Sequence, residues 1–356
     1  MKSFANLPVY YFYMIIYNLN SKEKKVYFMS KKIKFKSIKC LILVLLLSLS
    51  SVSFVGCGDD ENTVNIGYFN NVTHAQALLM KSDGSLEKSL GNDIEVKWTA
   101  FNAGPAEVEA LFAGDIDIGY IGPVPAVTAN VKSSGDISII SSATKGGAIL
   151  VKKKGSDIKS AKDLANKTVS VPQIGNTQHL CLLNLLSENG LKPITEGGNV
   201  NVTAVQNSDV ENLMERGDID AAIVPEPWGA TLLGKGAELV LDYDEIYYSG
   251  DYDVAVVVVR NEFKKEHPDI VEKFLQQHNI ATETITSDKE ECLKKINTEL
   301  KNSTGKSLGE DIISEAFTRI GVSTQLNKDS IMDFAKISKE QDFIKEVPSQ
   351  DSLFTK

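Results

Sequence analysis

The chain repeats one pattern about a hundred residues apart. Residues 106–125 read AEVEALFAGDIDIGYIGPVP, and residues 208–227 read SDVENLMERGDIDAAIVPEP. Each copy has apolar residues at i, i+3 and i+4, which is one stripe of a helix, then Gly-Asp-Ile-Asp, a short apolar run and a loop with two prolines. Two such units predict two similar lobes, and matching loops at strand ends predict a ligand cleft between them.

Residues 1–57 are predicted to be a leader. A basic stretch at 30–36 precedes the apolar run 40–55, which is the layout of a secretory signal. Met29 is then the expected start and residues 1–28 a mis-assigned extension; a genuine extension with a membrane function is the alternative. A transmembrane anchor is disfavoured because the apolar run is shorter than the ~20 residues of a membrane span.

Gly56 and Cys57 follow this run and resemble a bacterial lipobox, with Phe54 bulkier than the usual Leu or Val. The resemblance implies cleavage before Cys57 and lipidation of its thiol. Acyl chains gain ~0.8 kcal/mol per buried CH₂, so two or more of them make a stable anchor. The expected localisation is extracytoplasmic, lipid-anchored to the cell membrane.

The charge of the chain disfavours nucleic acid as a partner. The formal net charge is −9, and the leader holds nine lysines and one glutamate, so removing its +8 leaves −17. An acidic protein does not steer anions by its overall field, so local donors must hold any bound anion. Beyond Cys57 only Cys181 and Cys292 remain, and both are expected to be free, buried thiols.

Strand and helix patterns alternate along the rest of the chain, which predicts an α/β fold. The unalternating, β-branched run 254–259 predicts a strand buried on both faces, returning to the first lobe. Each lobe is expected to be a mostly parallel sheet flanked by helices. Lobe one comprises 63–150 plus 252–356, lobe two comprises 151–250, and the two crossings form a hinge.

Four stretches in order carry a family resemblance: GYFNNVTHAQAL (67–78), FNAGPAEVEALFAGDIDIGYIGP (101–123), IGNTQH (174–179) and VPEPW (224–228). The chain resembles the substrate-binding proteins of ABC importers, of the nitrate/sulfonate/taurine type with the type II periplasmic-binding fold. The resemblance implies a sulfonate, taurine or nitrate ligand and, as partners, an ABC permease and its ATPase. Two residues depart from the family: Asn70 replaces a common proline, and His179 replaces a common aspartate.

The first lobe offers a candidate anion site at a helix start. Thr73, a candidate N-cap, and His74 open the helix after the first strand, where free N–H groups favour an anion by roughly 0.3–1 kcal/mol. Gly122 lets a ligand approach the backbone, and Pro123 stiffens the same loop. Without a ligand, these residues are a helix cap, a packed side chain and an ordinary turn.

Further ligand donors are predicted where the chain leaves lobe one. Thr144 offers a hydroxyl, and Gly146 and Gly147 offer backbone N–H groups. Hinge flexibility without ligand contact is the alternative interpretation of the two glycines.

The second lobe mirrors this arrangement. Asn176, Thr177 and Gln178 open a helix, so two facing helix starts are expected to close over a small anionic group. Trp228 is a candidate wall, and Glu226 is a candidate acceptor for a ligand amine or hydroxyl. Because Glu226 would repel a sulfonate, a zwitterion or neutral polar ligand fits better if it faces inward. The alternatives are a capping motif and a surface carboxylate beside a core Trp.

Catalysis is poorly supported by the sequence. HExxH, CxxC, GxSxG and P-loop patterns are missing, and His179 and Cys181 are two residues apart on a helix and do not face one another. We expect no catalytic residues, no cofactor and no metal.

The leading hypothesis is a monomeric solute-binding protein that captures a small organic anion or zwitterion, closes its lobes and delivers this small-molecule ligand to an ABC permease. The alternatives are an enzyme or a pyrimidine- or thiamine-precursor-binding protein on the same fold. A further alternative is the sensor half of a receptor. This alternative is disfavoured because no apolar run follows that could be the transmembrane segment of a receptor.

Overall fold

The structure is a computed structural model that describes residues 62–355. These residues belong to one compact unit, 60–356. The predicted leader with Cys57 lies outside the described residues. Within the described part, no helix combines the length and apolar character needed to cross a membrane.

The first of two sheets in the described part has six strands, in the spatial order β11-β4-β10-β3-β1-β2. Their bounds are β1 Thr63–Phe69, β2 Glu95–Phe101, β3 Ile118–Ile121, β4 Ile137–Gly146, β10 Asp253–Arg260 and β11 Ile320–Val322. β1 pairs in parallel with β2 and β3, whereas β10 is antiparallel to both β3 and β4. All eight residues of β10 are buried, which confirms the strand predicted from its unalternating valines.

The second sheet of residues 62–355 has five strands, in the order β7-β6-β8-β5-β9. Their bounds are β5 Ala148–Lys152, β6 Thr168–Val171, β7 Asn201–Ala204, β8 Ala221–Pro225 and β9 Glu238–Leu241. β6 is parallel to β7 and β8, and β5 is antiparallel to β8 and β9. The α/β class is therefore as predicted, but the sheets are mixed rather than mostly parallel. The reason is that β5 and β10, the strands that enter the two sheets from a crossing, are antiparallel to the strands of the repeated unit, β8 and β3 respectively.

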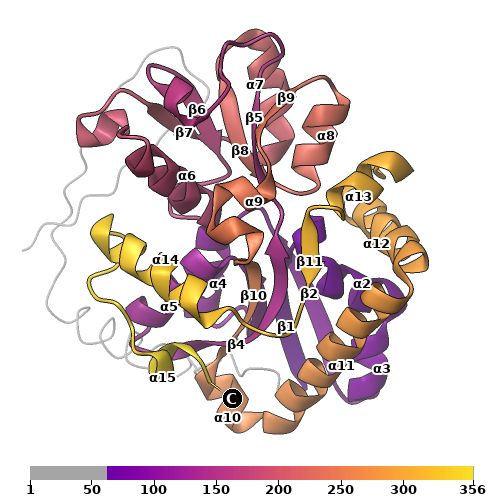
Figure 1. Ribbon diagram of the computed structural model, residues 1–356. Coiled ribbons are helices and arrows are strands. Elements are labelled where there is room, and N and C mark those ends of the chain that lie inside the picture. Colours follow the sequence, from indigo (N-terminus) through magenta and orange to yellow (C-terminus); the bar gives the residue numbers. More distant parts are fainter. Residues whose placement is uncertain (1–61, 356) are drawn as a thin grey trace, which may run out of the picture. The chain divides into compact units, whose positions relative to one another are not determined.

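Helices cover both faces of the first sheet (Figure 1). One face packs α2 Ala75–Asp83, α3 Ser85–Leu90, α11 Pro268–Ser287 and α12 Lys289–Thr304. The other packs α4 Gly104–Ala113, α5 Pro123–Lys132, α14 Lys328–Glu340 and α15 Gln350–Leu353. α10 Asn261–Glu266 follows β10. Alternate residues of β10 enter the two apolar clusters, as the period of a strand requires.

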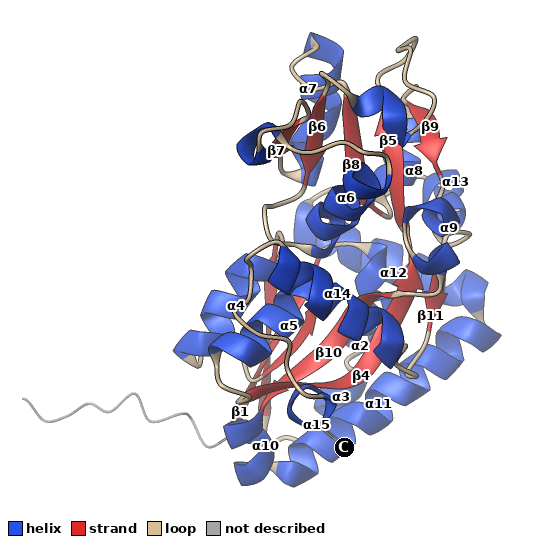
Figure 2. Cartoon of the chain, turned by 60° about the vertical axis from the view of Figure 1, so that its left-hand side comes forward, coloured by secondary structure: helices blue, strands red, loops and turns tan. Residues whose placement is uncertain are grey.

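The second sheet is covered in the same way. α6 Thr177–Glu188 and α9 Tyr243–Ile246 pack on one face, and α7 Val210–Arg216 and α8 Trp228–Gly234 pack on the other. The C-terminal part of the chain reaches this region, because α14 lies beside α6 and α13 Glu310–Ala316 packs on α8 (Figure 2). The 3₁₀ turns are η1 Val72–His74, η2 Ala161–Leu164, η3 Ile194–Glu196, η4 Asn207–Asp209 and η5 Tyr248–Gly250.

Both Gly-Asp-Ile-Asp segments have the same structural role. Asp117 accepts a hydrogen bond from the N–H of Asn65 on β1 at 2.8 Å, and Asp220 accepts one from the N–H of Thr168 on β6 at 2.7 Å. In each sheet the second aspartate therefore ties the turn to the parallel strand beside its own, β1 next to β3 and β6 next to β8. Arg260 on β10 adds a buried ion pair, with Nη2 2.8 Å from Oδ1 of Asp117.

The chain crosses between the sheets after β4 and again between β9 and β10. At the first crossing Gly146 and Gly147 have φ angles of 69° and 80°. This left-handed backbone favours glycine, so the conformation of the crossing explains why two glycines stand there.

Candidate functional site

A cavity lies where the strand ends of both sheets meet the starts of several helices. Its volume is about 30 Å³. That is less than the roughly 300–1,000 Å³ of pockets for drug-sized ligands, so the cavity suits a small solute.

The lining residues come from segments next to both sheets. They are Phe69, Asn71, Thr73, His74, Asn102, Ala103, Gly104, Gly122, Pro125, Pro172, Asn176, Thr177, Gln178, Asn207, Pro225 and Val254. Most follow the carboxyl ends of β1, β2, β3, β6, β7 or β8, the edge at which α/β sheets usually bind ligands.

On the first-sheet side, Asn71 organises the helix start. Its Oδ1 accepts hydrogen bonds from the N–H of Thr73 at 3.0 Å and from the Thr73 hydroxyl. Asn71 is therefore the N-cap of the 3₁₀ turn η1, which leads into α2, and the prediction that Thr73 is the N-cap is wrong. The β-region backbone of Asn71, with φ −146° and ψ 161°, allows its side chain to reach forward.

His74 is neutral in this site. Its Nδ1 accepts a hydrogen bond from the N–H of Phe69 at 3.1 Å, so the ring proton lies on Nε2. Burial lowers the pKa of His74 to about 3. The imidazole can therefore donate a hydrogen bond but carries no positive charge near neutral pH.

On the second-sheet side a related arrangement occurs. The Oδ1 of Asn176 accepts a hydrogen bond from the N–H of His179 at 2.8 Å and caps α6. Nδ1 of His179 accepts the N–H of Gly175 at 3.1 Å, and burial lowers the pKa of this histidine to about 4. The N–H groups of Thr177 and Gln178 are in the first turn, where helices have no internal acceptors.

The two helix starts share the sequence Asn-x-x-His, as NVTH at 71–74 and NTQH at 176–179. Asn71 caps the 3₁₀ turn η1 and Asn176 caps α6, and in both copies the buried His accepts a backbone N–H through Nδ1. This short motif was the missed signal for Asn71. His74 lines the cavity, whereas the ring of His179 packs on Phe343, with ring centroids 5.5 Å apart.

The lining carries no charged side chain. Two buried polar atoms there have no hydrogen-bond partner within the described structure, the hydroxyl of Thr177 and Oδ1 of Asn207. Buried polar atoms normally have partners, so these two are free to bind a polar solute. Neutral donors and helix N-termini can hold an anion without a lysine or arginine.

Gly122 brings the two halves into close contact at this cavity. A Cβ added at Gly122 would lie less than 3.0 Å from the hydroxyl oxygen of Thr177, a separation that real Cβ atoms essentially never show. Gly122 therefore permits an approach between the α5 start and the α6 start that no other residue allows.

The structure brings together six of the predicted ligand-binding residues around the cavity: Thr73, His74, Gly122, Asn176, Thr177 and Gln178. Pro123, the first residue of α5, is outside the lining. Thr144 is also outside, because its hydroxyl donates to the carbonyl oxygen of Thr73 at 2.6 Å. Gly146 lies at the crossing, where an added Cβ would meet Tyr243 and the backbone of Arg319.

Glu226 and Trp228 also lie outside the cavity lining. Glu226 is fully buried, where it accepts the N–H of Ala230 at 2.9 Å and pairs with Arg319 at 3.2 Å. Trp228 opens α8 and packs on the apolar cluster between α7, α8 and the second sheet. The local sequence could not reveal this, because Arg319 is 93 residues from Glu226.

The thiols behave as predicted, since Cys181 and Cys292 are free and buried. Within the described residues, no group of three or more His, Cys, Asp or Glu is placed to hold a metal ion.

Comparison with known proteins supports a common ancestry. A model of the NMT1-like family matches residues 58–297. The taurine-binding periplasmic protein of Escherichia coli (strain K12) is 30% identical over 227 residues, which cover 64% of this chain and 67% of that protein.

Solved structures show the same fold. The alkanesulfonate-binding protein of Xanthomonas axonopodis pv. citri, bound to MOPS, has a TM-score of 0.68 at 21% identity, covering 81% of this chain and 95% of that one. The periplasmic nitrate-binding protein of Synechocystis PCC 6803 has a TM-score of 0.68 at 15% identity, covering 82% of this chain and 84% of that one.

Proposed function

The chain belongs to the NMT1-like family, and from this premise we propose that it is an extracytoplasmic solute-binding protein of an ABC importer. Its ligand is a small organic anion or zwitterion of the sulfonate, taurine or nitrate class. The relative from Escherichia coli is named for taurine, and the two structural neighbours are named for alkanesulfonate and nitrate.

One observation carries this proposal: a small, uncharged cavity lies between two similar helix starts. Thr73 and His74 contribute from one side, and Asn176, Thr177 and Gln178 contribute from the other. First-turn N–H groups, hydroxyls and amides bind oxyanions by hydrogen bonds, each strengthened by the charge of the ligand.

Ligand release would require the two halves to separate. We assign one lobe to 63–150 plus 252–356 and the other to 151–250, with the two crossings as the hinge. Such hinge closure around a solute is common among two-lobed binding proteins. The left-handed glycines Gly146 and Gly147 at the first crossing suit this role.

The membrane tether is proposed from the sequence of the leader. We propose that Cys57 is lipidated after removal of a signal peptide, so that a monomer is tethered at the membrane beside its permease and ATPase. The protein delivers its solute unchanged and is not an enzyme. Mass spectrometry of the membrane fraction tests the anchor: Cys57 carries acyl groups, and Cys57→Ser abolishes them. An unmodified Cys57 in the wild type contradicts it.

Calorimetry and thermal unfolding of residues 58–356 test the binding function. We expect 1-propanesulfonate, taurine or nitrate to bind and to raise the stability by RT ln(1 + [L]/Kd), about 2.7 kcal/mol at a hundredfold excess over Kd. If none of these solutes produces heat or shifts the melting temperature, the proposal is wrong.

The site itself is tested by Thr177→Val, which removes the unpartnered hydroxyl but keeps the side-chain shape. Loss of one hydrogen bond to a charged ligand should weaken binding by about ten- to a hundredfold. Thr231→Val is the matched control, because its hydroxyl donates to the carbonyl of Pro227 outside the cavity. Equal affinities for the two variants would place the ligand elsewhere.

A further inference from the structure

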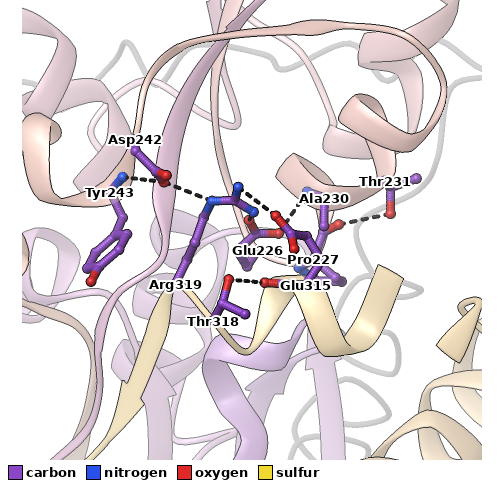
Figure 3. Close-up of polar contacts among 9 residues, drawn as sticks. All are labelled: Glu226, Pro227, Ala230, Thr231, Asp242, Tyr243, Glu315, Thr318 and Arg319. Atoms are coloured by element: carbon purple, nitrogen blue, oxygen red, sulfur yellow. Dashed lines mark hydrogen bonds and ion pairs between the residues drawn. The ribbon is translucent and has the colours of Figure 1, made fainter. Parts of the chain in front are cut away.

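The buried Arg319 pairs with three carboxylates beside the crossing (Figure 3). Its Nε is 2.8 Å from Asp242, its Nη1 is 3.2 Å from Glu226 and its Nη2 is 2.8 Å from Glu315. The Arg319 side chain is 8% exposed and that of Glu226 is 0% exposed. All three hydrogen-bonding faces of the guanidinium are thus used, which Lys could not reproduce.

The cluster joins segments that belong to different sheets. Arg319 directly precedes β11 of the first sheet, and Glu315 is on α13. Glu226 directly follows β8 of the second sheet, and Asp242 is the N-cap of α9. Two of the three ion pairs therefore cross from the C-terminal segment to the second-sheet side, as Figure 3 shows.

Glu226 is also next to the candidate ligand cavity. Pro225, the residue before it, lines that cavity. The N–H of Glu226 donates to the carbonyl oxygen of Gly147 at 2.7 Å, and an added Cβ at Gly147 would lie 3.5 Å from Thr73. Glu226 is therefore a buried carboxylate on the residue that directly follows a lining residue, and the lining carries no charge of its own.

An unpaired carboxylate at this position would oppose an anion in the cavity. Like charges that are brought together in a buried site weaken binding strongly, and low-dielectric surroundings screen them little. The guanidinium of Arg319 supplies the opposite charge to Glu226, so the loop after β8 is compatible with a bound anion.

We propose that Arg319, although it does not line the cavity, determines ligand specificity by neutralising Glu226, and so sets the preference of the site between plain anions and zwitterions. This inference rests on the proposed function. Arg319 is a positioning residue, since it acts through Glu226 and touches no ligand.

Two isosteric probes measure this preference. 1-Propanesulfonate and taurine share the sulfonate and two methylene groups, and differ by a terminal methyl in place of an ammonium group. Their Kd values are measured by calorimetry at pH 8, and the ratio of Kd for propanesulfonate to Kd for taurine is compared among variants. The ammonium group of taurine should compensate a negative charge on Glu226 that has no counter-charge, whereas the methyl group of propanesulfonate cannot compensate it.

In Arg319→Met the ratio should rise by about tenfold or more. An ionised Glu226 penalises propanesulfonate most, and a protonated Glu226 can still lose its proton to pair with the ammonium group of taurine. The double variant Arg319→Met/Glu226→Gln should return the ratio to within about twofold of the wild-type value. Arg260→Met is the matched control: it breaks another buried Arg–carboxylate pair, with Asp117, and should lower the melting temperature without changing the ratio.

The inference is overturned if Arg319→Met leaves the ratio unchanged, or if adding Glu226→Gln does not restore it, because a purely structural Arg319 predicts both results. Should Arg319→Met not fold, Glu226→Gln alone carries the test: it leaves the guanidinium less neutralised, so the ratio should fall, and an unchanged or higher ratio refutes the inference. A wild-type protein that binds neither probe instead contradicts the proposed function for sulfonates.

Discussion

Replacing Gly122 by Ala should weaken ligand binding while leaving each half of the protein folded. Gly122 has φ −66° and ψ 150°, a conformation that alanine adopts without strain. The new Cβ would meet the Thr177 hydroxyl oxygen at less than 3.0 Å, but would lie 3.5 Å from Cβ of Thr177 and from Pro125. The clash therefore involves a single oxygen atom, at the contact between the start of α5 and the start of α6.

The size of the effect follows from this geometry. Overpacking a close contact costs typically about 1–3 kcal/mol, which corresponds to roughly 5- to 150-fold in affinity. The lower end applies if Thr177 rotates about χ1 to put its hydrogen toward the new methyl group. That rotation also turns the hydroxyl away from the cavity, so binding weakens in either case.

Calorimetry with the tightest-binding sulfonate measures the effect, and a double-mutant cycle assigns it. In a Thr177→Ala background the clashing oxygen is absent, so Gly122→Ala should then cost almost nothing. Gly321→Ala is the control, because its added Cβ meets nothing within 4 Å. Wild-type affinity in Gly122→Ala, or an equal cost in both backgrounds, would refute the reasoning that closure brings these two residues together.

Three further predictions concern charge. Glu107 is buried, its carboxylate oxygens have no partner in the described structure, and burial raises its pKa well above 4.5. The unfolded chain ionises Glu107 above pH 4.5, whereas burial opposes its ionisation in the folded chain, so the wild type loses up to ~1.4 kcal/mol of stability per pH unit above pH 4.5. Glu107→Gln should therefore unfold at the same temperature as the wild type at pH 4 and at a higher temperature at pH 8; an equal difference at both pH values contradicts this. His74 and His179, with pKa values of about 3 and about 4, stay neutral from pH 5.5 to 8, so sulfonate affinity measured by calorimetry should change less than about twofold there; a tenfold gain at pH 5.5 would indicate a charged imidazole. Because the lining has no charged side chain, raising NaCl from about 50 to 500 mM should not weaken sulfonate binding, whereas a site built on Lys or Arg would lose affinity.

Patterns within short segments were sufficient to predict the α/β class and much of the cavity. The helical periodicity, the turn and the strand of the duplicated unit all lie within one short segment. They can therefore be predicted without knowledge of any contact with a distant segment. Helix starts after strands are also local, and this is why Thr73, Asn176, Thr177 and Gln178 were identified as candidates. The cap Asn71 was missed although the same local evidence, Asn-x-x-His in both halves, was available.

Contacts between distant segments explain what those patterns could not predict. Asn207 and Val254 line the cavity only because the loop after β7 and the start of β10 are brought to the same place. The orientation of β5 and β10 depends on how the chain returns after each crossing, so local periodicity suggested more parallel pairing than exists.

Glu226 is the sharpest example of this difference. Its sequence neighbours Pro225 and Trp228 suggested a carboxylate facing a ligand, and they carry no information about a partner 93 residues away. A buried charge is stable only with its partners, and Arg319 reaches Glu226 only when the C-terminal segment packs against the second sheet. Short-range sequence therefore accounts for the elements and their caps, whereas the electrostatic environment of the cavity arises from long-range packing.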